Sequence, residues 1–162
     1  MERYATPNFT PGRSGDTVRL VVVHTTDGSF RDTVAWFGNP ESRVSAHYLV
    51  GLSGRVIQFV AEEDTARHAG RVREPTADLP GPDPNLYSVG IEFEDGGDPM
   101  TVARPDEQYR AGADLLAGIA RRWDVPLDRA HVLGHREVFR AKLCPGNLDI
   151  DRLLREAAVS AS

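Results

Sequence analysis

The chain of 162 residues has one cysteine and no long apolar segment. Because Cys144 is the single cysteine, an internal disulfide is excluded and the redox compartment is not indicated. No run of about 18 apolar residues is present, so no membrane-spanning helix is predicted. The first 16 residues, MERYATPNFTPGRSGD, lack the basic and apolar regions of a secretory signal. We therefore expect any action outside a cell to depend on another factor for release.

An excess of positive charge is also missing. The chain carries 24 acidic and 19 basic side chains, which gives a formal net charge of -5. Nucleic-acid binding depends on clustered lysine and arginine, and adhesion to an anionic membrane requires similar clusters. We therefore expect neither nucleic acid nor a membrane as a partner.

The length is sufficient for one domain with a hydrophobic core and too short for two. Residues 1–16 are rich in proline, glycine, serine and threonine and are expected to form an irregular arm. No internal repeat or linker is evident. We expect residues 1–162 to form a single domain, and the protein to be a monomer.

Alternating strand and helix patterns predict an α/β protein. The β-branched run VRLVVV, at Val18 to Val23, is typical of a central strand buried on both faces. Apolar positions three and four residues apart predict an amphipathic helix over Asp106 to Trp123. The remaining predicted elements are a helix at Asp32 to Phe37 with Val34, Trp36 and Phe37 available to pack, a hairpin of Ser45 to Val50 and Arg55 to Val60, strands at Val89 to Phe93 and His131 to Leu133, and a helix at Asp149 to Val159.

The segment LGHREVFRAKLCPGN contains three side chains that suit a cation and the chemistry beside it. In an extended segment residues two apart point the same way, so Lys142 and Cys144 should face one site. A lone cysteine is more often a buried small apolar residue. The polar turn at Pro145 and Gly146 weakens that alternative here. With His135, Cys144 supplies two zinc ligands, whereas a catalytic zinc site needs a third.

The sequence positions of the other four histidines indicate metal binding to different degrees. His24 closes the predicted central strand, where open α/β sheets place their ligands, although it could also cap the strand through backbone hydrogen bonds. His47 lies among large apolar neighbours and His131 in a short strand, so both are interpreted as structural. His68 precedes proline-rich chain within residues 61–87, which predicts a wall or lid. We expect His68 to be a cleft residue rather than a ligand.

Glu92 lies in the strand SVGIEFED, which has one apolar and one acidic face. Taken alone, a carboxylate in this pattern is most simply a solvent-facing group on an edge strand. The alternative is a catalytic carboxylate opposite the packing face.

Five separate motifs, in order, resemble the zinc-dependent N-acetylmuramoyl-L-alanine amidases of the amidase-2 type. This family shares its fold with the peptidoglycan recognition proteins and supplies catalytic domains of many bacteriophage endolysins. The resemblance runs from about Val18 to Leu154 and implies a central mixed β-sheet flanked by helices. The motifs are VVV before His24, SAHYLVGLSGRVIQFV, HAG at His68, GIE at Glu92, and LGHREVFRAKLCPG.

The resemblance implies a role for each matching residue. The zinc ligands would be His24, His135 and Cys144, Glu92 would be the catalytic acid and base, and Lys142 would stabilise the oxyanion. Thr25 and His68 are expected to contact the substrate, peptidoglycan. Some phage members carry a tyrosine where this chain has Ala46, so more of the catalysis is expected to fall to Glu92. The third ligand is cysteine in many phage members and aspartate in the cytoplasmic recycling branch.

The resemblance thus implies hydrolysis of the amide between N-acetylmuramic acid and L-alanine. Cys144 and the hairpin favour a phage or prophage lysin that acts on the bacterial cell wall after another factor releases it from the host cytoplasm. Two alternatives stay open, namely a peptidoglycan-binding module without activity and a cytoplasmic amidase that recycles muropeptides. A catalytic domain separated from a wall-binding domain is a further expectation.

Overall fold

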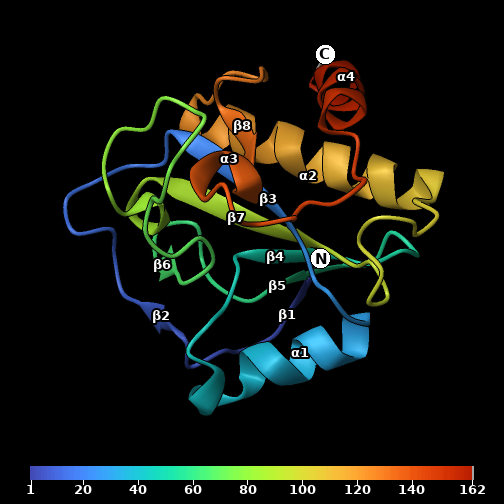
Figure 1. Ribbon diagram of the computed structural model, residues 1–162, viewed down its shortest axis with the longest axis horizontal. Coiled ribbons are helices and arrows are strands. Elements are labelled where there is room, and N and C mark those ends of the chain that lie inside the picture. Colours follow the sequence, from blue (N-terminus) through green and yellow to red (C-terminus); the bar gives the residue numbers. More distant parts are fainter. Residues whose placement is uncertain (162) are drawn as a thin grey trace.

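The computed structural model describes residues 1–161 and contains a six-stranded mixed sheet with helices on both faces (Figure 1). The strand order is β1-β5-β4-β7-β3-β8, which confirms the predicted class of fold. The strands of this sheet are β1 (Glu2–Arg3), β3 (Leu20–Thr25), β4 (Tyr48–Val50), β5 (Val56–Gln58), β7 (Ser88–Phe93) and β8 (Val132–Gly134). The helices are α1 (Phe30–Gly38), α2 (Asp106–Trp123), α3 (His135–Val138) and α4 (Ile150–Ser160), with 3-10 turns η1 (Pro40–Ser42) and η2 (Pro84–Leu86).

Strand β3 lies in the interior of the sheet, as its β-branched run predicts. It pairs in parallel with β7 on one side and with β8 on the other. The strand continues to Thr25, so His24 lies within it rather than after its end. Strand β7 is also interior, because β4 pairs with its other edge. The interpretation of Glu92 as an edge-strand residue is therefore wrong.

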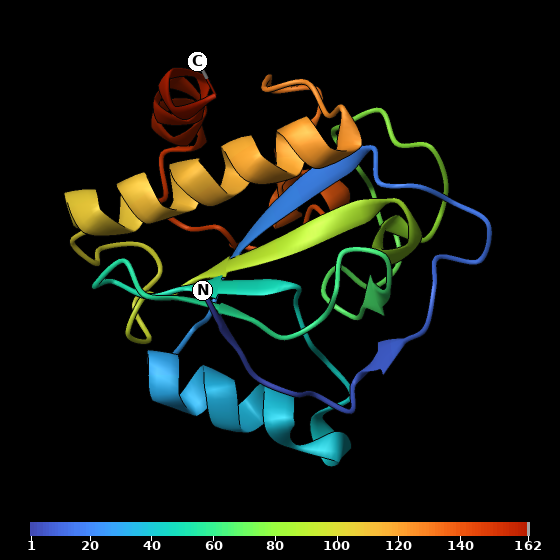
Figure 2. The same ribbon diagram turned by 180° about the vertical axis from the view of Figure 1, so that it is seen from behind.

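The larger hydrophobic core lies between the sheet and helices α2 and α4 (Figure 2). Helix α2 has the predicted bounds, and most of its apolar stripe, including Leu116 and Ile119, is buried. A Cβ atom on Gly112 would approach Phe93 Cε1 to 2.5 Å, so this glycine permits close contact between helix and sheet. The packing leaves the opposite face of β3 and β7 available for a site.

Helix α1 covers the opposite face over β4 and β5 (Figure 1). Ser29 caps its N-terminus by accepting a hydrogen bond from the Asp32 N–H, and Phe37 packs inward. Trp36 was expected to pack as well, but its side chain is 54% exposed. Successive helical residues are about 100° apart, so adjacent apolar residues cannot all face the same core.

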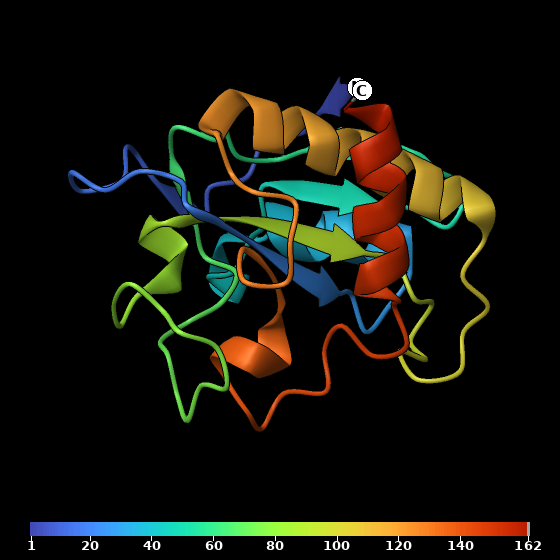
Figure 3. The same ribbon diagram turned by 90° about the horizontal axis from the view of Figure 1, so that it is seen from above.

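The rest of this face is covered by α3 and by the segment 61–87 (Figure 3). This segment contains η2 and the short strand β6 (Thr65–Ala66), which pairs with β2 (Phe9–Thr10) in a separate two-stranded sheet. A gap in this cover, between α1 and the chain after α3, is where the cavity described below opens. None of the helices in residues 1–161 has the length and apolar character that crossing a bilayer requires.

The N-terminal arm is held more firmly than its composition predicts. Strand β1 adds to the sheet edge in parallel with β5. Arg13 is buried and donates hydrogen bonds to the carbonyl oxygens of four residues of segment 61–87 and β7, and its Nη2 lies 3.0 Å from His47 Nε2. The expectation of an irregular arm is thus only partly met, because one buried guanidinium fixes the arm to the segment beside the site.

Candidate metal centre

The residues of the site lie at or next to the carboxyl ends of three neighbouring parallel strands, β7, β3 and β8. Strand β3 carries His24 and β7 carries Glu92, while β8 ends at Gly134, directly before His135. A Cβ atom on Gly134 would approach Pro145 Cδ to 2.6 Å. The glycine therefore lets the turn that contains Cys144 pack against the end of β8.

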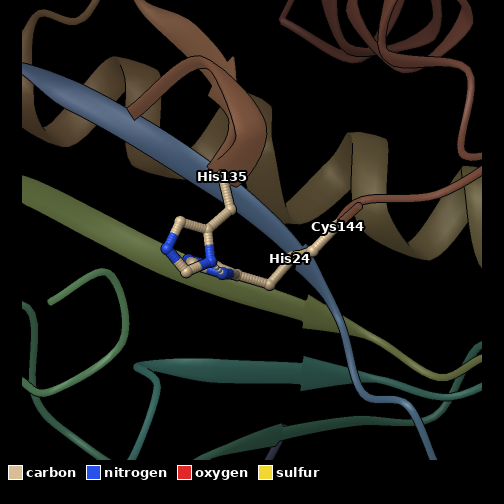
Figure 4. Close-up of side chains that lie close together, drawn as sticks. All are labelled: His24, His135 and Cys144. Atoms are coloured by element: carbon tan, nitrogen blue, oxygen red, sulfur yellow. Dashed lines mark hydrogen bonds between the residues drawn. The ribbon is translucent and has the colours of Figure 1, made fainter. Parts of the chain in front are cut away.

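His24, His135 and Cys144 lie together, with their candidate ligand atoms all within 4.8 Å of one another. Figure 4 shows that the three side chains come from β3, the start of α3 and the following turn. The Nδ1 atoms of His24 and His135 are 3.1 Å apart. Two nitrogens bound to a tetrahedral zinc at about 2.0–2.1 Å are roughly 3.3 Å apart, so the observed spacing suits one shared ion.

The far nitrogen of each ligand ring has a different partner. His135 Nε2 lies 3.1 Å from the Ala69 carbonyl oxygen, which can only accept, so Nε2 carries the proton and Nδ1 has the free lone pair. His24 Nε2 lies 2.9 Å from His68 Nδ1. In both rings Nδ1 is thus the atom that faces the shared point.

Both ligand histidines are neutral at neutral pH, as metal binding requires. Burial, followed by the charge of Lys142, lowers the pKa of His135 to about 4. Burial, and then the neighbouring His135, lowers the pKa of His24 well below its usual value. The facing lone pairs of two neutral rings form a position that a cation would stabilise.

Cys144 completes the donor set. The Thr25 backbone N–H donates to Cys144 Sγ at 3.1 Å, a contact that stabilises a thiolate. Burial, and then the charge of Glu92, raises the pKa of the thiol to about 12 in the metal-free protein. A metal must therefore displace this proton. Imidazole nitrogen and thiolate sulfur are donors that zinc prefers, and three protein ligands leave one tetrahedral position open, so these residues fit zinc.

Glu92 faces the same cavity as the three candidate ligands. Burial and the charge of Asp95 raise the pKa of its carboxyl group to about 8. Its Oε2 atom is buried and has no hydrogen-bond partner among the described residues. A nearby divalent cation would lower this pKa, because opposite charge favours the carboxylate.

Lys142 and Cys144 both line the cavity, as their spacing in the sequence predicts. The Lys142 ammonium also lies 5.8 Å from the ring centroid of Phe139. Its charge lies close enough to His24 and His135 to lower the pKa of each. The cavity is therefore lined by a cation and a buried acid as well as by the candidate metal ligands.

The cavity has a volume of about 740 Å³ and shares lining residues, including His135 and Lys142, with a second cavity of about 390 Å³. His68 lines both, and Thr25 lines the first, so each residue expected to contact substrate lies at the surface of a cavity. The second cavity is strongly basic although the protein is acidic overall. Its basic lining residues are Arg43, Arg67, Arg71, Arg73 and Lys142.

His47 and His131, which were interpreted as structural, both lie outside the donor set, as does His68. His47 is fully buried and accepts a hydrogen bond from the Gly90 N–H at Nδ1. His131 Nδ1 lies 2.7 Å from Asp128 Oδ1. The sequence reasoning missed the contact of His68 with His24 and the position of Trp36 in the cavity wall. Helical spacing could have indicated the second of these, because Trp36 and Phe37 point in different directions.

A mixed sheet with two histidines and a cysteine gathered at the ends of its parallel strands defines an α/β protein with a candidate mononuclear metal site. The family model described as N-acetylmuramoyl-L-alanine amidase, of the amidase-2 type, matches residues 14–147, so the chain belongs to this family.

Two curated relatives and one solved structure illustrate the similarity. N-acetylmuramoyl-L-alanine amidase A of Achromobacter lyticus is 37% identical over 75 residues, which cover 46% of this chain and 36% of that protein. The 1,6-anhydro-N-acetylmuramyl-L-alanine amidase AmpD of Haemophilus influenzae is 30% identical over 118 residues, 70% of this chain and 59% of its own length. The crystal structure of a selenomethionine AmpD derivative superposes with a TM-score of 0.80 at 24% identity, and covers 96% of this chain and 93% of that one. The chain thus spans less than two thirds of either curated relative.

Proposed function

We propose that this protein is a zinc-dependent amidase that cleaves the amide bond between N-acetylmuramic acid and the L-alanine of the peptidoglycan stem peptide. The observation that carries the proposal is the pair of facing Nδ1 atoms of His24 and His135, 3.1 Å apart and close to Cys144 Sγ. Membership of the amidase family supports the identity of the bond.

The donor set would hold zinc, which when bound supplies a Lewis acid that acidifies a water molecule and polarises the amide carbonyl. Glu92, whose Oε2 has no hydrogen-bond partner among the described residues, would take a proton from the attacking water and pass it to the departing L-alanine amine. The Lys142 ammonium, which lines the same cavity, would stabilise the negative charge that develops on the carbonyl oxygen.

The basic second cavity supports an acidic substrate. Its arginines gather beside His68 in a protein with a net charge of -5, so positive charge is concentrated at this cavity although the chain as a whole is acidic. The peptide stem carries carboxylates, whereas the glycan strand is largely uncharged. We therefore propose that the stem extends into the second cavity and that Thr25 and His68 flank the cleaved bond.

We propose cell-wall lysis as the setting, with the protein reaching the wall after another factor releases it. The cysteine at position 144, where the recycling branch has aspartate, supports this choice. Recycling of soluble muropeptides is the second candidate, and the 30% identity to AmpD favours it. Hydrolysis rates measured side by side on intact cross-linked wall and on soluble anhydro-muropeptide distinguish lysis from recycling. A recycling enzyme should act only on the soluble muropeptide.

The test of the activity is mass spectrometry of digested wall, combined with elemental analysis. We expect new L-alanine amino termini, intact glycan strands and one zinc ion per chain. His24→Ala and Cys144→Ser should lose both zinc and activity, and a chelator should abolish lysis measured by turbidity. Lysis that persists after metal removal would contradict the zinc mechanism. Binding to the wall without cleavage would instead identify a peptidoglycan-binding module.

A further inference from the structure

The His-Ala-Gly turn after β6 contacts both candidate histidine ligands at Nε2, the ring nitrogen that faces away from the candidate metal position. His68 Nδ1 lies 2.9 Å from His24 Nε2, and the carbonyl oxygen of the next residue, Ala69, lies 3.1 Å from His135 Nε2. We propose that His68 is a positioning residue, which fixes the tautomer and ring orientation of His24 so that its Nδ1 is presented to the metal. This inference rests on the proposed zinc site.

Ser88, His68 and His24 form a series of hydrogen bonds, and the donor in each one follows from the bond that Ser88 makes. Ser88 Oγ donates its proton to the Pro84 carbonyl oxygen at 2.6 Å. Its oxygen is then free to accept from His68 Nε2, 3.3 Å away. With the proton on Nε2, the neutral His68 ring has an acceptor at Nδ1.

That acceptor determines the state of His24. Because His68 Nδ1 accepts, His24 Nε2 carries the proton and donates it at 2.9 Å. The lone pair of the neutral His24 ring then lies on Nδ1, which faces His135. If Ser88 offered its proton to His68 instead, the order would reverse and His24 Nδ1 would be protonated, which is incompatible with metal binding.

The backbone is adapted to hold the His68 ring in this place. A Cβ atom on Gly90 would lie 2.4 Å from His68 Cγ, so glycine in β7 creates the space that the imidazole occupies. The Asn85 side-chain oxygen accepts hydrogen bonds from the backbone N–H groups of His68 and Ala69, at 3.0 and 2.9 Å. One turn, held at two consecutive residues, thereby orients both imidazole ligands.

Two substitutions of His68 test separately whether the volume of the side chain or its hydrogen-bond acceptor matters. His68→Leu keeps an apolar volume but removes the acceptor, whereas His68→Asn keeps an acceptor oxygen near the position of Nδ1. Zinc affinity is measured by competition with a chelator, and the absorption spectrum of the cobalt-substituted protein reports ligand geometry. We expect His68→Leu to bind zinc about 10- to 100-fold more weakly. His68→Asn should stay within a few-fold of the natural chain, and thermal unfolding serves as the check on folding.

A measurement on the metal-free natural protein makes the proposal independent of these variants. The nitrogen chemical shifts of the imidazoles distinguish a protonated from an unprotonated ring nitrogen. We expect protonated Nε2 and unprotonated Nδ1 in His24, and a mixture of tautomers after Ser88→Ala. The opposite His24 tautomer in the natural chain would overturn the inference.

The two proposals can fail separately. Zinc affinity in a folded His68→Leu variant equal to that of the natural chain would overturn the role of His68 and leave the zinc enzyme intact. Equal losses in His68→Leu and His68→Asn would also overturn it, because the acceptor would then be irrelevant. Failure of the natural chain to bind zinc at all would instead count against the proposed function.

Discussion

Glu92 and His24 are register partners on the neighbouring parallel strands β7 and β3, and their side chains enter the same cavity. The pairing holds the candidate catalytic carboxylate beside a candidate metal ligand without a flexible connection between them. Because both strands are interior to the sheet, the backbone positions of the two residues are fixed by hydrogen bonds on both edges of each strand.

Replacement of Glu92 tests the role of that carboxylate. We expect Glu92→Gln to lower kcat by about 10²- to 10⁴-fold, the usual contribution of general acid–base catalysis, and to leave zinc content unchanged. Steady-state kinetics on a defined muropeptide and elemental analysis provide the two readouts. Glu63→Gln, at an exposed position away from the cavity, is the matched control. Full activity in Glu92→Gln would rule out the assigned role.

Lys142 is expected to act on the transition state more than on the bound substrate. Lys142→Met should reduce kcat by about 10²- to 10³-fold with little change in KM, because the stabilised charge develops only during the reaction. Arg136→Met is the control, since it removes a nearby exposed cation that does not line the cavity. A change confined to KM would show that the ammonium binds substrate only.

The buried guanidinium of Arg13 is expected to contribute strongly to stability. Its removal leaves four carbonyl oxygens, two buried and two partly buried, without this donor, so Arg13→Met should lower the free energy of unfolding by about 3–5 kcal/mol. Arg19→Met provides the comparison, because Arg19 is exposed. It forms an ion pair with the nearby Asp16, worth about 1 kcal/mol or less, and its guanidinium lies 5.4 Å from the ring centroid of Tyr87. Urea unfolding measures both. Equal losses in the two variants would refute the anchoring role.

Acid should destabilise the metal-free protein through His47. Burial and the charge of Arg13 lower the pKa of His47 to about 3, whereas an unfolded chain binds the same proton near pH 6.5. The unfolded state therefore takes up the proton first, so stability is complete above about pH 6.5 and falls as the pH decreases towards 3, by up to about 1.4 kcal/mol per pH unit from this residue.

The check is urea unfolding between about pH 4.5 and 7.5 in the presence of a chelator. His47→Asn keeps an acceptor for the Gly90 N–H without a titrating ring, and should reduce the pH slope by close to one proton. His24, His68 and His135 contribute in the same direction and remain in the variant. An unchanged slope would mean that His47 is protonated in the folded protein.

Elements with a strong periodic pattern were predicted closely. The bounds of α2 are those expected from its apolar spacing, and the β4–β5 hairpin forms across the predicted turn. The short helix α3 was not predicted, because four residues are too few to show a period. Trp36 was misplaced because its apolar character does not reveal which side of α1 it occupies.

The sequence by itself supplied the candidate donors, His24 at the end of a predicted strand and His135 and Cys144 in the segment around the Pro-Gly turn, and the family resemblance joined them into one ligand set. It could not determine that β7 is an interior strand, because strand order depends on pairing between residues far apart in the chain. It also gave no indication that His68 lies behind His24. That contact requires the ring to enter the space above Gly90, and only the packing of the His-Ala-Gly turn against the sheet creates it.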